Sequence, residues 1–517
     1  MKYLHKVLDG IRKIPWTVIN RYVMGVLILG LQIGIIYFAI QIFQTYILWF
    51  YGSVIFVEFI FVLIILNRNM LTEFQMTWII FILMFPAVGL IAYLIVYSSV
   101  GNKQIKKKID DYHEQTKQYR NTSIYVKKQI KDESMMSYMH YLETTCCYKT
   151  YPISNLEYHE MGNVAYEALL KDLKKATKFI LIETFILAKG TMWDEILSVL
   201  IEKVKEGVEV YLIYDGTCNF TLLPFSYKEE LQQLGLKVAV FSSFKPLIQP
   251  HYNNRDHRKL ILVDGNVAYH GGYNIADEYI GRVERFGFWK DTGIRIEGEA
   301  VNSFILMFFE MWYVCTDEMI LFDSFLSKKQ EVDLGKGYII PFADNPIDEF
   351  HTAHDSYVTM IHQATKRVDI MTPYLILDSN ISTALKNASL RGIKVRIIMP
   401  SIPDKKIVYY IGKNHYKELM DVGIEVYEYL PGFNHSKMLL CDSEVAIIGS
   451  INLDYRSFYL NYENASFIYQ HEVLKKMASD FEKTLLQSEQ MTPEKVAAYP
   501  FYKKLIGRIF KIFAPLM

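Results

Sequence analysis

A pattern of polar residues occurs twice in this 517-residue chain, with the same spacing in both copies. In each copy a histidine stands two positions before a lysine, and an aspartate, a pair of small residues and an asparagine follow. The members are His257, Lys259, Asp264, Gly271-Gly272 and Asn274 in the first copy, and His435, Lys437, Asp442, Gly449-Ser450 and Asn452 in the second. Packing alone gives no reason to repeat a set of polar side chains.

The His-x-Lys pair is typical of the start of a buried β-strand. Apolar residues follow Lys259 and Lys437, and strand side chains alternate, so each histidine and its lysine emerge on the same face. A histidine there can be a nucleophile or a general acid and base, because its pKa lies near neutrality. The lysine suits a phosphate oxygen, to which Asn274 and Asn452 could also donate.

Two such copies placed face to face would surround one anion with two histidines, two lysines and two asparagines. One histidine could then attack phosphorus while the other protonates the leaving oxygen. Each histidine could instead be a satisfied structural residue, but the matched second copy argues against this. We expect no metal, because a lysine at the centre of each motif would repel a divalent ion.

The repeat extends beyond the polar residues to short apolar stretches introduced by glycine or by a charged turn. These stretches are 176–184 with 364–372, 207–213 with 392–398, and 235–238 with 423–426. Helical patterns lie between them, and this alternation predicts an α/β fold with a mostly parallel sheet covered by helices. We expect two homologous halves, 151–330 and 331–490, packed about a pseudo-twofold axis. The motif regions, 251–278 and 430–457, should lie at their interface.

Two carboxylates also match between the copies, Asp291 in the first half and Glu463 in the second. A catalytic histidine needs a partner on its other ring nitrogen to fix its tautomer. We therefore predict that each carboxylate supports one histidine. The alternative is a surface carboxylate at the start of a strand. Asp264 and Asp442 lie at the far ends of their strands, where they could orient the site without touching phosphate.

Long uncharged runs dominate the first hundred residues. From 22 to 66 the only charged residue is Glu58, and a further uncharged run from 77 to 97 contains Pro86. At 1.5 Å per residue these runs predict a membrane anchor over 1–102, with spans near 22–44, 48–66 and 77–97. Glu58 is either a functional carboxylate or one buried against a neighbouring helix.

Charged segments flank the predicted catalytic part. Residues 103–150 predict a helical linker that begins with four lysines in six positions, and basic residues favour the cytoplasmic side. Three spans would place the basic N-terminal tail on the opposite side, so this rule leaves the topology open.

The C-terminal tail, 491–517, mixes bulky apolar and basic residues at helical spacing. It predicts an amphipathic helix that lies on anionic lipid or docks on the catalytic part.

The composition excludes several classes of protein. Lysine and arginine together number 56, and so do aspartate and glutamate, so no net charge selects a polyanion such as nucleic acid. The five cysteines show no metal-site or disulfide spacing. We expect no cofactor.

The motif spacing and its surroundings resemble the phospholipase D superfamily, and within it the bacterial cardiolipin synthases. The runs that carry this resemblance are 254–259, 271–279, 295–298, 372–374, 404–406 and 450–458. The likeness extends over nearly everything after about residue 70, and it is specific because it goes beyond the two motifs. Two positions depart from the usual pattern, Cys441 in place of an aliphatic residue and Asn434 in place of an apolar one.

The resemblance implies catalytic roles for His257, Lys259, Asp264, His435, Lys437 and Asp442. It also implies a cardiolipin synthase of the cell membrane, multi-pass and with a cytoplasmic catalytic part. Such an enzyme transfers a phosphatidyl group between two phosphatidylglycerol molecules through a phosphohistidine. Motif chemistry alone leaves the acceptor open, so a membrane phospholipase D or another head-group transferase is the alternative. A non-catalytic membrane scaffold would be expected to lose one of these residues, and all six are present. The choice of nucleophile and the oligomeric state stay open.

Overall fold

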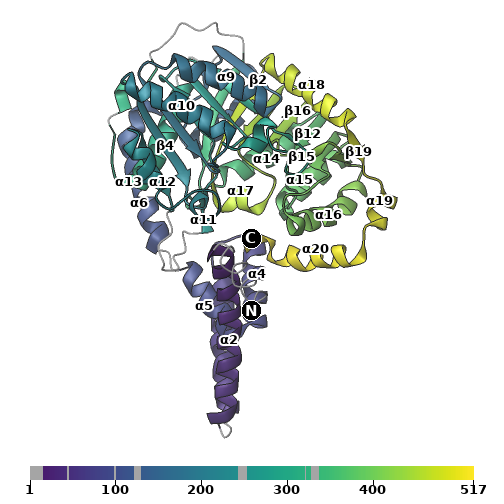
Figure 1. Ribbon diagram of the computed structural model, residues 1–517. Coiled ribbons are helices and arrows are strands. Elements are labelled where there is room, and N and C mark those ends of the chain that lie inside the picture. Colours follow the sequence, from purple (N-terminus) through teal and green to yellow (C-terminus); the bar gives the residue numbers. More distant parts are fainter. Residues whose placement is uncertain are drawn as a thin grey trace, which may run out of the picture.

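The computed structural model describes residues 16–42, 46–97, 100–120, 130–242, 253–320, 322–327 and 337–516. The first fifteen residues of the predicted anchor, the last two residues of the predicted span 22–44, residues 121–129 of the predicted linker, and positions 251 and 252 of the first motif region lie outside these ranges. Two α/β halves form the upper part of the molecule, and the N-terminal helices project from it as a stalk (Figure 1).

The first half contains a seven-stranded sheet with the order β2-β10-β8-β7-β3-β4-β5. Its strands are β2 (Asn155–His159), β3 (Phe179–Thr184), β4 (Glu209–Asp215), β5 (Lys237–Phe241), β7 (Leu260–Val263), β8 (Val267–Gly271) and β10 (Gly293–Glu297). Helices α9 (Gly162–Lys175) and α10 (Thr191–Lys205) pack on one face of this sheet through a cluster of buried apolar residues.

The second half repeats this strand order as β11-β18-β17-β16-β12-β13-β14 within a ten-stranded sheet. Its strands are β11 (Tyr338–Asp344), β12 (Arg367–Met371), β13 (Lys394–Pro400), β14 (Glu425–Tyr429), β16 (Met438–Cys441), β17 (Val445–Gly449) and β18 (Asn461–Tyr469), with β1 (Tyr151–Pro152) and β19 (Ser488–Gln490) at the edges. The matching strand orders agree with the repeat seen in the sequence.

The prediction of a mostly parallel sheet is wrong. In the two large sheets β3-β4-β5 and β12-β13-β14 run parallel, and the short tenth strand of the second sheet, β6 (Arg255–Asp256), pairs parallel with β18. By contrast, β7, β8 and β10 and their counterparts in the second half pair antiparallel. The reason lies directly after the motif strands. Asp264 and Gly265, like Asp442 and Ser443, adopt left-handed backbone conformations with φ between 52° and 70°. The chain therefore reverses within three residues, too few for a parallel crossover.

Helix α13 (Val301–Thr316) joins the two halves. It contacts β5, β7 and β8 of the first half and β11 of the second. Twelve of its residues are buried, from Val301 to Val314, as expected for a helix that packs on several sides. One apolar core runs through it from one sheet to the other.

The segment predicted as a linker packs on the catalytic part. Helix α6 (Val100–Thr116) lies against α13, and α8 (Glu133–Cys146) lies against β11 and α14 (Thr352–Gln363). His113 of α6 contacts Glu310 of α13 at 2.7 Å, and Glu310 also pairs with the buried Arg258 at 3.1 Å. A buried ionic cluster thus attaches this segment beside the first motif.

The stalk consists of α2 (Trp16–Ile42), α3 (Ile47–Leu66), α4 (Thr72–Met84) and α5 (Pro86–Tyr97). The third predicted span is not one helix, because Pro86 lacks an N–H and cannot continue a helix. Trp78 and Tyr93 have ring centroids only 5.3 Å apart, so α4 and α5 fold back on each other. Over the part of the chain that the structure covers, no helix has both the length and the apolar character needed to cross a membrane. Glu58 is buried.

Candidate active site

Each motif histidine follows a short strand that pairs with the other half. These strands are β6 (Arg255–Asp256), which pairs with β18, and β15 (Gly432–Asn434), which pairs with β9 (Phe288–Lys290). The main-chain N–H of His257 donates to the carbonyl of Tyr462 at 2.9 Å, and that of His435 donates to Lys290 at 2.7 Å. Reciprocal pairings of this kind are those that a twofold relation generates.

The two carboxylates contact the histidines crosswise. Glu463 of the second half lies 2.9 Å from Nδ1 of His257 through both of its oxygens. Asp291 of the first half lies 2.6 Å from Nδ1 of His435. With Nδ1 donating to a carboxylate, Nε2 of each imidazole carries the lone pair needed for attack or proton transfer. The sequence did not predict that the partners are exchanged between the halves.

The small residues of each motif give the carboxylates room. A Cβ on Gly272 would lie 2.0 Å from Oδ1 of Asp291. The matching position of the second half holds Ser450, whose hydroxyl donates to the longer Glu463. Gly449 is needed for a related reason, because a Cβ there would lie 2.2 Å from a main-chain oxygen of β18.

Both motif lysines are buried beside the histidines. Lys259 and Lys437 are 3% and 1% exposed, and each Nζ donates to the carbonyl of the histidine in its own motif, at 2.6 and 2.5 Å. Burial lowers the pKa of Lys259 to about 7 and that of Lys437 to about 8. A phosphate oxygen beside them would favour their charged forms.

The histidines and carboxylates are shifted in opposite directions. Burial lowers the pKa of His257 and His435 well below the usual range, and the motif lysines add to this effect. Burial raises the pKa of Asp291 and of Glu463 to about 7. A bound anion would favour the charged forms of the lysines and histidines. A buried cluster of side chains whose pKa values are shifted in this way is typical of a functional site.

Two further cations, Lys405 and Arg456, add to the positive charge around His257 and lower its pKa. Lys405 Nζ lies 5.0 Å from the ring centroid of Tyr374, and Arg456 donates twice to Asn253 at 2.9 Å. Both residues belong to runs that carry the family resemblance. The spacing of the two motifs predicts no role for Lys405 or Arg456.

The two histidines differ in their aromatic surroundings. The ring of His435 lies 5.4 Å from Tyr279, 5.4 Å from Trp289 and 5.6 Å from Phe433. His257 has Phe185 at 5.0 Å. The surroundings of His435 are therefore more aromatic than those of His257. The matched spacing of the two motifs does not predict this difference.

The structure does not bring Asp264 or Asp442 to the histidines. Asp264 accepts hydrogen bonds from the main chain of Thr177, Lys178 and Phe179 at 2.8 to 3.0 Å. Asp442 accepts the equivalent bonds, at 2.8 Å, from the main chain of residues 365–367. Each lies at the far end of a strand from its lysine, about 17 Å along an extended chain. These aspartates anchor the start of the neighbouring strand and make no contact with the reacting groups.

The motif asparagines make internal contacts. Asn274 accepts from the main chain of Ile186 at 3.0 Å and donates to the hydroxyl of Tyr279 at 2.6 Å. The buried Oδ1 of Asn452 has no hydrogen-bond partner among the described residues. Phosphate binding by either side chain stays a prediction.

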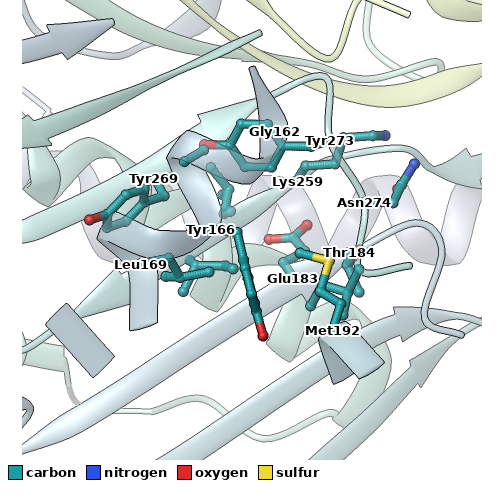
Figure 2. Close-up of a pocket in the computed structure, with 14 residues that line it drawn as sticks. Gly162, Tyr166, Leu169, Glu183, Thr184, Met192, Lys259, Tyr269, Tyr273 and Asn274 are labelled. Carbon is teal, nitrogen blue, oxygen red and sulfur yellow. The ribbon is translucent and has the colours of Figure 1, made fainter. Parts of the chain in front are cut away.

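A small cavity lies behind Lys259, on the first-half side of the site (Figure 2). Its volume of about 20 Å³ is enough for roughly one water molecule and excludes a lipid head group. Glu183 lines it, and burial raises the pKa of this carboxyl well above its usual range. The cavity therefore lies next to the first motif but is too small to receive the substrate.

Comparison with known proteins agrees with this geometry. The family described as cardiolipin synthase, PLD-like domain, matches residues 169–303 and 357–485. The chain is 34% identical to cardiolipin synthase 2 of Bacillus anthracis over 90% of this chain and 89% of the relative. It is 38% identical to a cardiolipin synthase of Alkalihalophilus pseudofirmus over 69% and 71%.

The fold also matches a solved structure, the phosphatidylserine synthase of Haemophilus influenzae. The TM-score is 0.57 at 15% identity, with 75% of this chain and 100% of that chain covered. At this identity the match concerns the fold alone. The two profile matches, one in each half, and the long alignments with named relatives confirm the resemblance seen in the motifs. The chain belongs to the cardiolipin synthase family of phospholipase D-like proteins.

Proposed function

We propose that the protein is a cardiolipin synthase that joins two phosphatidylglycerol molecules and releases glycerol. The observation that carries the chemistry is the crosswise pair of histidine–carboxylate contacts between two buried lysines. Two histidines with Nε2 available, in a cationic and largely buried site, suit a double displacement at a phosphodiester. The relatives that are named cardiolipin synthases support this choice of reaction.

In the first step, Nε2 of His257 attacks the phosphorus of one phosphatidylglycerol. An N–P bond forms and the P–O bond to glycerol breaks. The departing oxygen takes a proton from Nε2 of His435, which the ionised Asp291 and the bound phosphodiester anion keep in its protonated form. Lys259 and Lys437 neutralise the charge that builds on the phosphoryl oxygens. The assignment of His257 as nucleophile rests on the family resemblance, since the hydrogen-bond geometry of the two histidines is equivalent.

In the second step, the terminal hydroxyl of another phosphatidylglycerol attacks the phosphohistidine. His435, now neutral, takes the hydroxyl proton, a new P–O bond forms, and the N–P bond breaks to release His257. Glu463 and Asp291 stabilise the imidazolium that forms on each partner histidine. The overall reaction exchanges one phosphodiester for another, so the transfer is reversible.

The identity of the acceptor decides between a synthase and a phospholipase. Purified protein in detergent should be given phosphatidylglycerol as the only phospholipid, and the products should be resolved by mass spectrometry. Cardiolipin together with glycerol supports the proposal. Phosphatidic acid as the only lipid product would make water the acceptor and the protein a phospholipase D. His257→Ala and His435→Ala should each abolish turnover, and near-normal activity in either would refute the two-histidine mechanism.

We also propose that the stalk and α20 (Phe501–Phe513) attach the enzyme to the bilayer, with the catalytic halves on the cytoplasmic side. Trp49 is 79% exposed, and Val26 and Phe56 are 68% and 63% exposed, an arrangement that suits contact with lipid. Helix α20 lies beneath the catalytic halves beside α4, near the head of the stalk (Figure 1). Extraction of membranes with alkaline carbonate tests the attachment. Protease protection in oriented vesicles tests the side, and whether any part of the stalk crosses.

A further inference from the structure

A second cavity, of about 560 Å³, lies between α16 (Lys406–Met420), α19 (Pro493–Ala498) and α20. None of the motif residues lines it. Its volume falls within the range of about 300–1,000 Å³ that small-molecule sites occupy. The lining contains six basic residues, Lys413, Lys417, Lys495, Lys504, Arg508 and Lys511, against two acidic ones, Glu418 and Asp421.

The fold holds the walls of this cavity in place. Gly507 of α20 touches α16 so closely that a Cβ there would lie 2.3 Å from the carbonyl oxygen of Tyr410. At its far end α20 accepts a hydrogen bond from Thr77 of α4 to the carbonyl of Ile512, at 2.8 Å. The helix is therefore docked along its length, and the cavity does not depend on a loose end of the chain.

The acidic residues neutralise only part of the lining. Lys417 pairs with Asp421 at 2.6 Å, and Lys511 lies 3.6 Å from Glu418. Two other lining lysines pair with carboxylates outside the lining, Lys413 with Glu428 at 2.5 Å and Lys495 with Glu489 at 2.9 Å. Lys504 donates to a main-chain carbonyl of α19 at 2.7 Å and keeps its other donors. Arg508 has no hydrogen-bond or ion-pair partner in the described part of the chain. Lys504 and Arg508 thus leave the cavity with an excess of positive charge beside α20.

The outer side of the same helix is apolar and exposed. Phe501 is 72% exposed, Leu505 44%, Ile509 48% and Ile512 43%. A helix with an apolar outer face and basic residues beside it is suited to lie at an anionic membrane surface. A basic cavity at the edge of such a face would open toward the lipid head groups.

We propose that this cavity binds the phosphodiester head group of an anionic phospholipid, separately from the substrate in the active site. Arg508 and Lys504 supply the donors, because a guanidinium and an ammonium are the usual phosphate ligands. The apolar face of α20 lets the acyl chains stay in the bilayer. A soluble phosphate ester has the same charged group but no acyl chains, so it would use the cations without the apolar face.

The test is hydrogen–deuterium exchange of the full chain in a neutral detergent, followed by mass spectrometry. Micelles should contain phosphatidylglycerol or phosphatidylcholine, and a third sample should contain inorganic phosphate. We expect phosphatidylglycerol to slow exchange in α19, α20 and the facing part of α16, and phosphatidylcholine and phosphate to have no such effect. Turnover during the measurement does not matter, because the product is also an anionic phospholipid. The readout is independent of the catalytic proposal.

Two matched variants sharpen the test. Lys504→Gln/Arg508→Gln removes two cavity cations, and Lys503→Gln/Lys475→Gln removes two cations that do not line the cavity. Each cation at an anionic lipid surface is worth about fivefold in affinity, so the first variant should need roughly 25-fold more phosphatidylglycerol for the same protection. The second variant should need only about fivefold more, because Lys503 is its one cation on α20 and Lys475 lies on α18 (Val473–Leu486). Thermal melting must show that both variants are folded.

Three results would overturn the proposal. Equal protection by phosphatidylcholine would mean that head-group charge is not recognised. Equal protection by inorganic phosphate would make this a site for a soluble anion. An unchanged response in Lys504→Gln/Arg508→Gln would show that the lipid does not use the cavity cations.

Discussion

Replacing Glu463 by glutamine should slow turnover about a thousandfold while leaving the fold intact. Both oxygens of this buried carboxylate lie 2.9 Å from Nδ1 of His257. When His257 becomes positively charged in the reaction, the two charge centres are about 4 Å apart, which at an effective dielectric constant of ~20 is worth about 4 kcal/mol. Glutamine keeps the shape and loses that charge, and 4 kcal/mol corresponds to about three powers of ten in rate.

The assay is the initial rate of cardiolipin formation from phosphatidylglycerol, with protein concentration corrected for the folded fraction. Glu157→Gln is a suitable control, because this carboxylate is half exposed and pairs with Arg295 on β10. Asp291→Asn should cause a loss similar to that of Glu463→Gln, since it makes the equivalent contact with His435. A rate for Glu463→Gln within about threefold of the unchanged protein would refute the role given to the crosswise contacts.

Three further predictions concern pH and stability. The pH profile of kcat/KM should be bell-shaped and centred near 7, because Glu463, with a pKa of about 7, must be ionised and Lys259, also with a pKa of about 7, must be protonated. Bound phosphate raises the pKa of the lysine, so the alkaline limb of kcat should lie at higher pH than that of kcat/KM, and coincident limbs would contradict a lysine–phosphate contact. Glu310→Gln leaves the buried Arg258 without its charged partner and should lower the free energy of unfolding by about 3–5 kcal/mol, measured by denaturant titration. Asp442→Asn replaces one of two accepting oxygens by a donor that faces main-chain N–H groups, so it should lower stability by about 2–4 kcal/mol. Because Asp442 does not touch the reacting groups, kcat/KM per folded molecule should stay within about threefold, and a loss as large as that of a histidine variant would show that this aspartate acts in the chemistry.

The polar repeat was sufficient to predict two homologous halves, because a matched spacing of His, Lys and Asn has no packing explanation. It also pointed to Asp291 and Glu463 as histidine partners. It could not show that the partners are exchanged, because that depends on the pairing of β6 with β18 and of β15 with β9, strands far apart in the sequence. Such long-range pairings leave no local pattern.

Two other predictions failed for local reasons. The apolar stretches suggested parallel strands, but the left-handed turns after the motif strands impose antiparallel hairpins. The uncharged run that contains Pro86 suggested one span, but the proline divides it into two short helices that pack together. In both cases a turn-forming position outweighed the hydrophobic pattern around it.

The crosswise contacts also determine when a newly made chain can become active. A ribosome that has synthesised the first motif has produced His257 but not Glu463, which comes 206 residues later. Until that residue emerges, the first histidine lacks its carboxylate and the second motif is incomplete. A growing chain that already touches the bilayer is therefore unable to cleave the lipids around it. Activity begins only when most of the polypeptide has been translated and both halves have folded together.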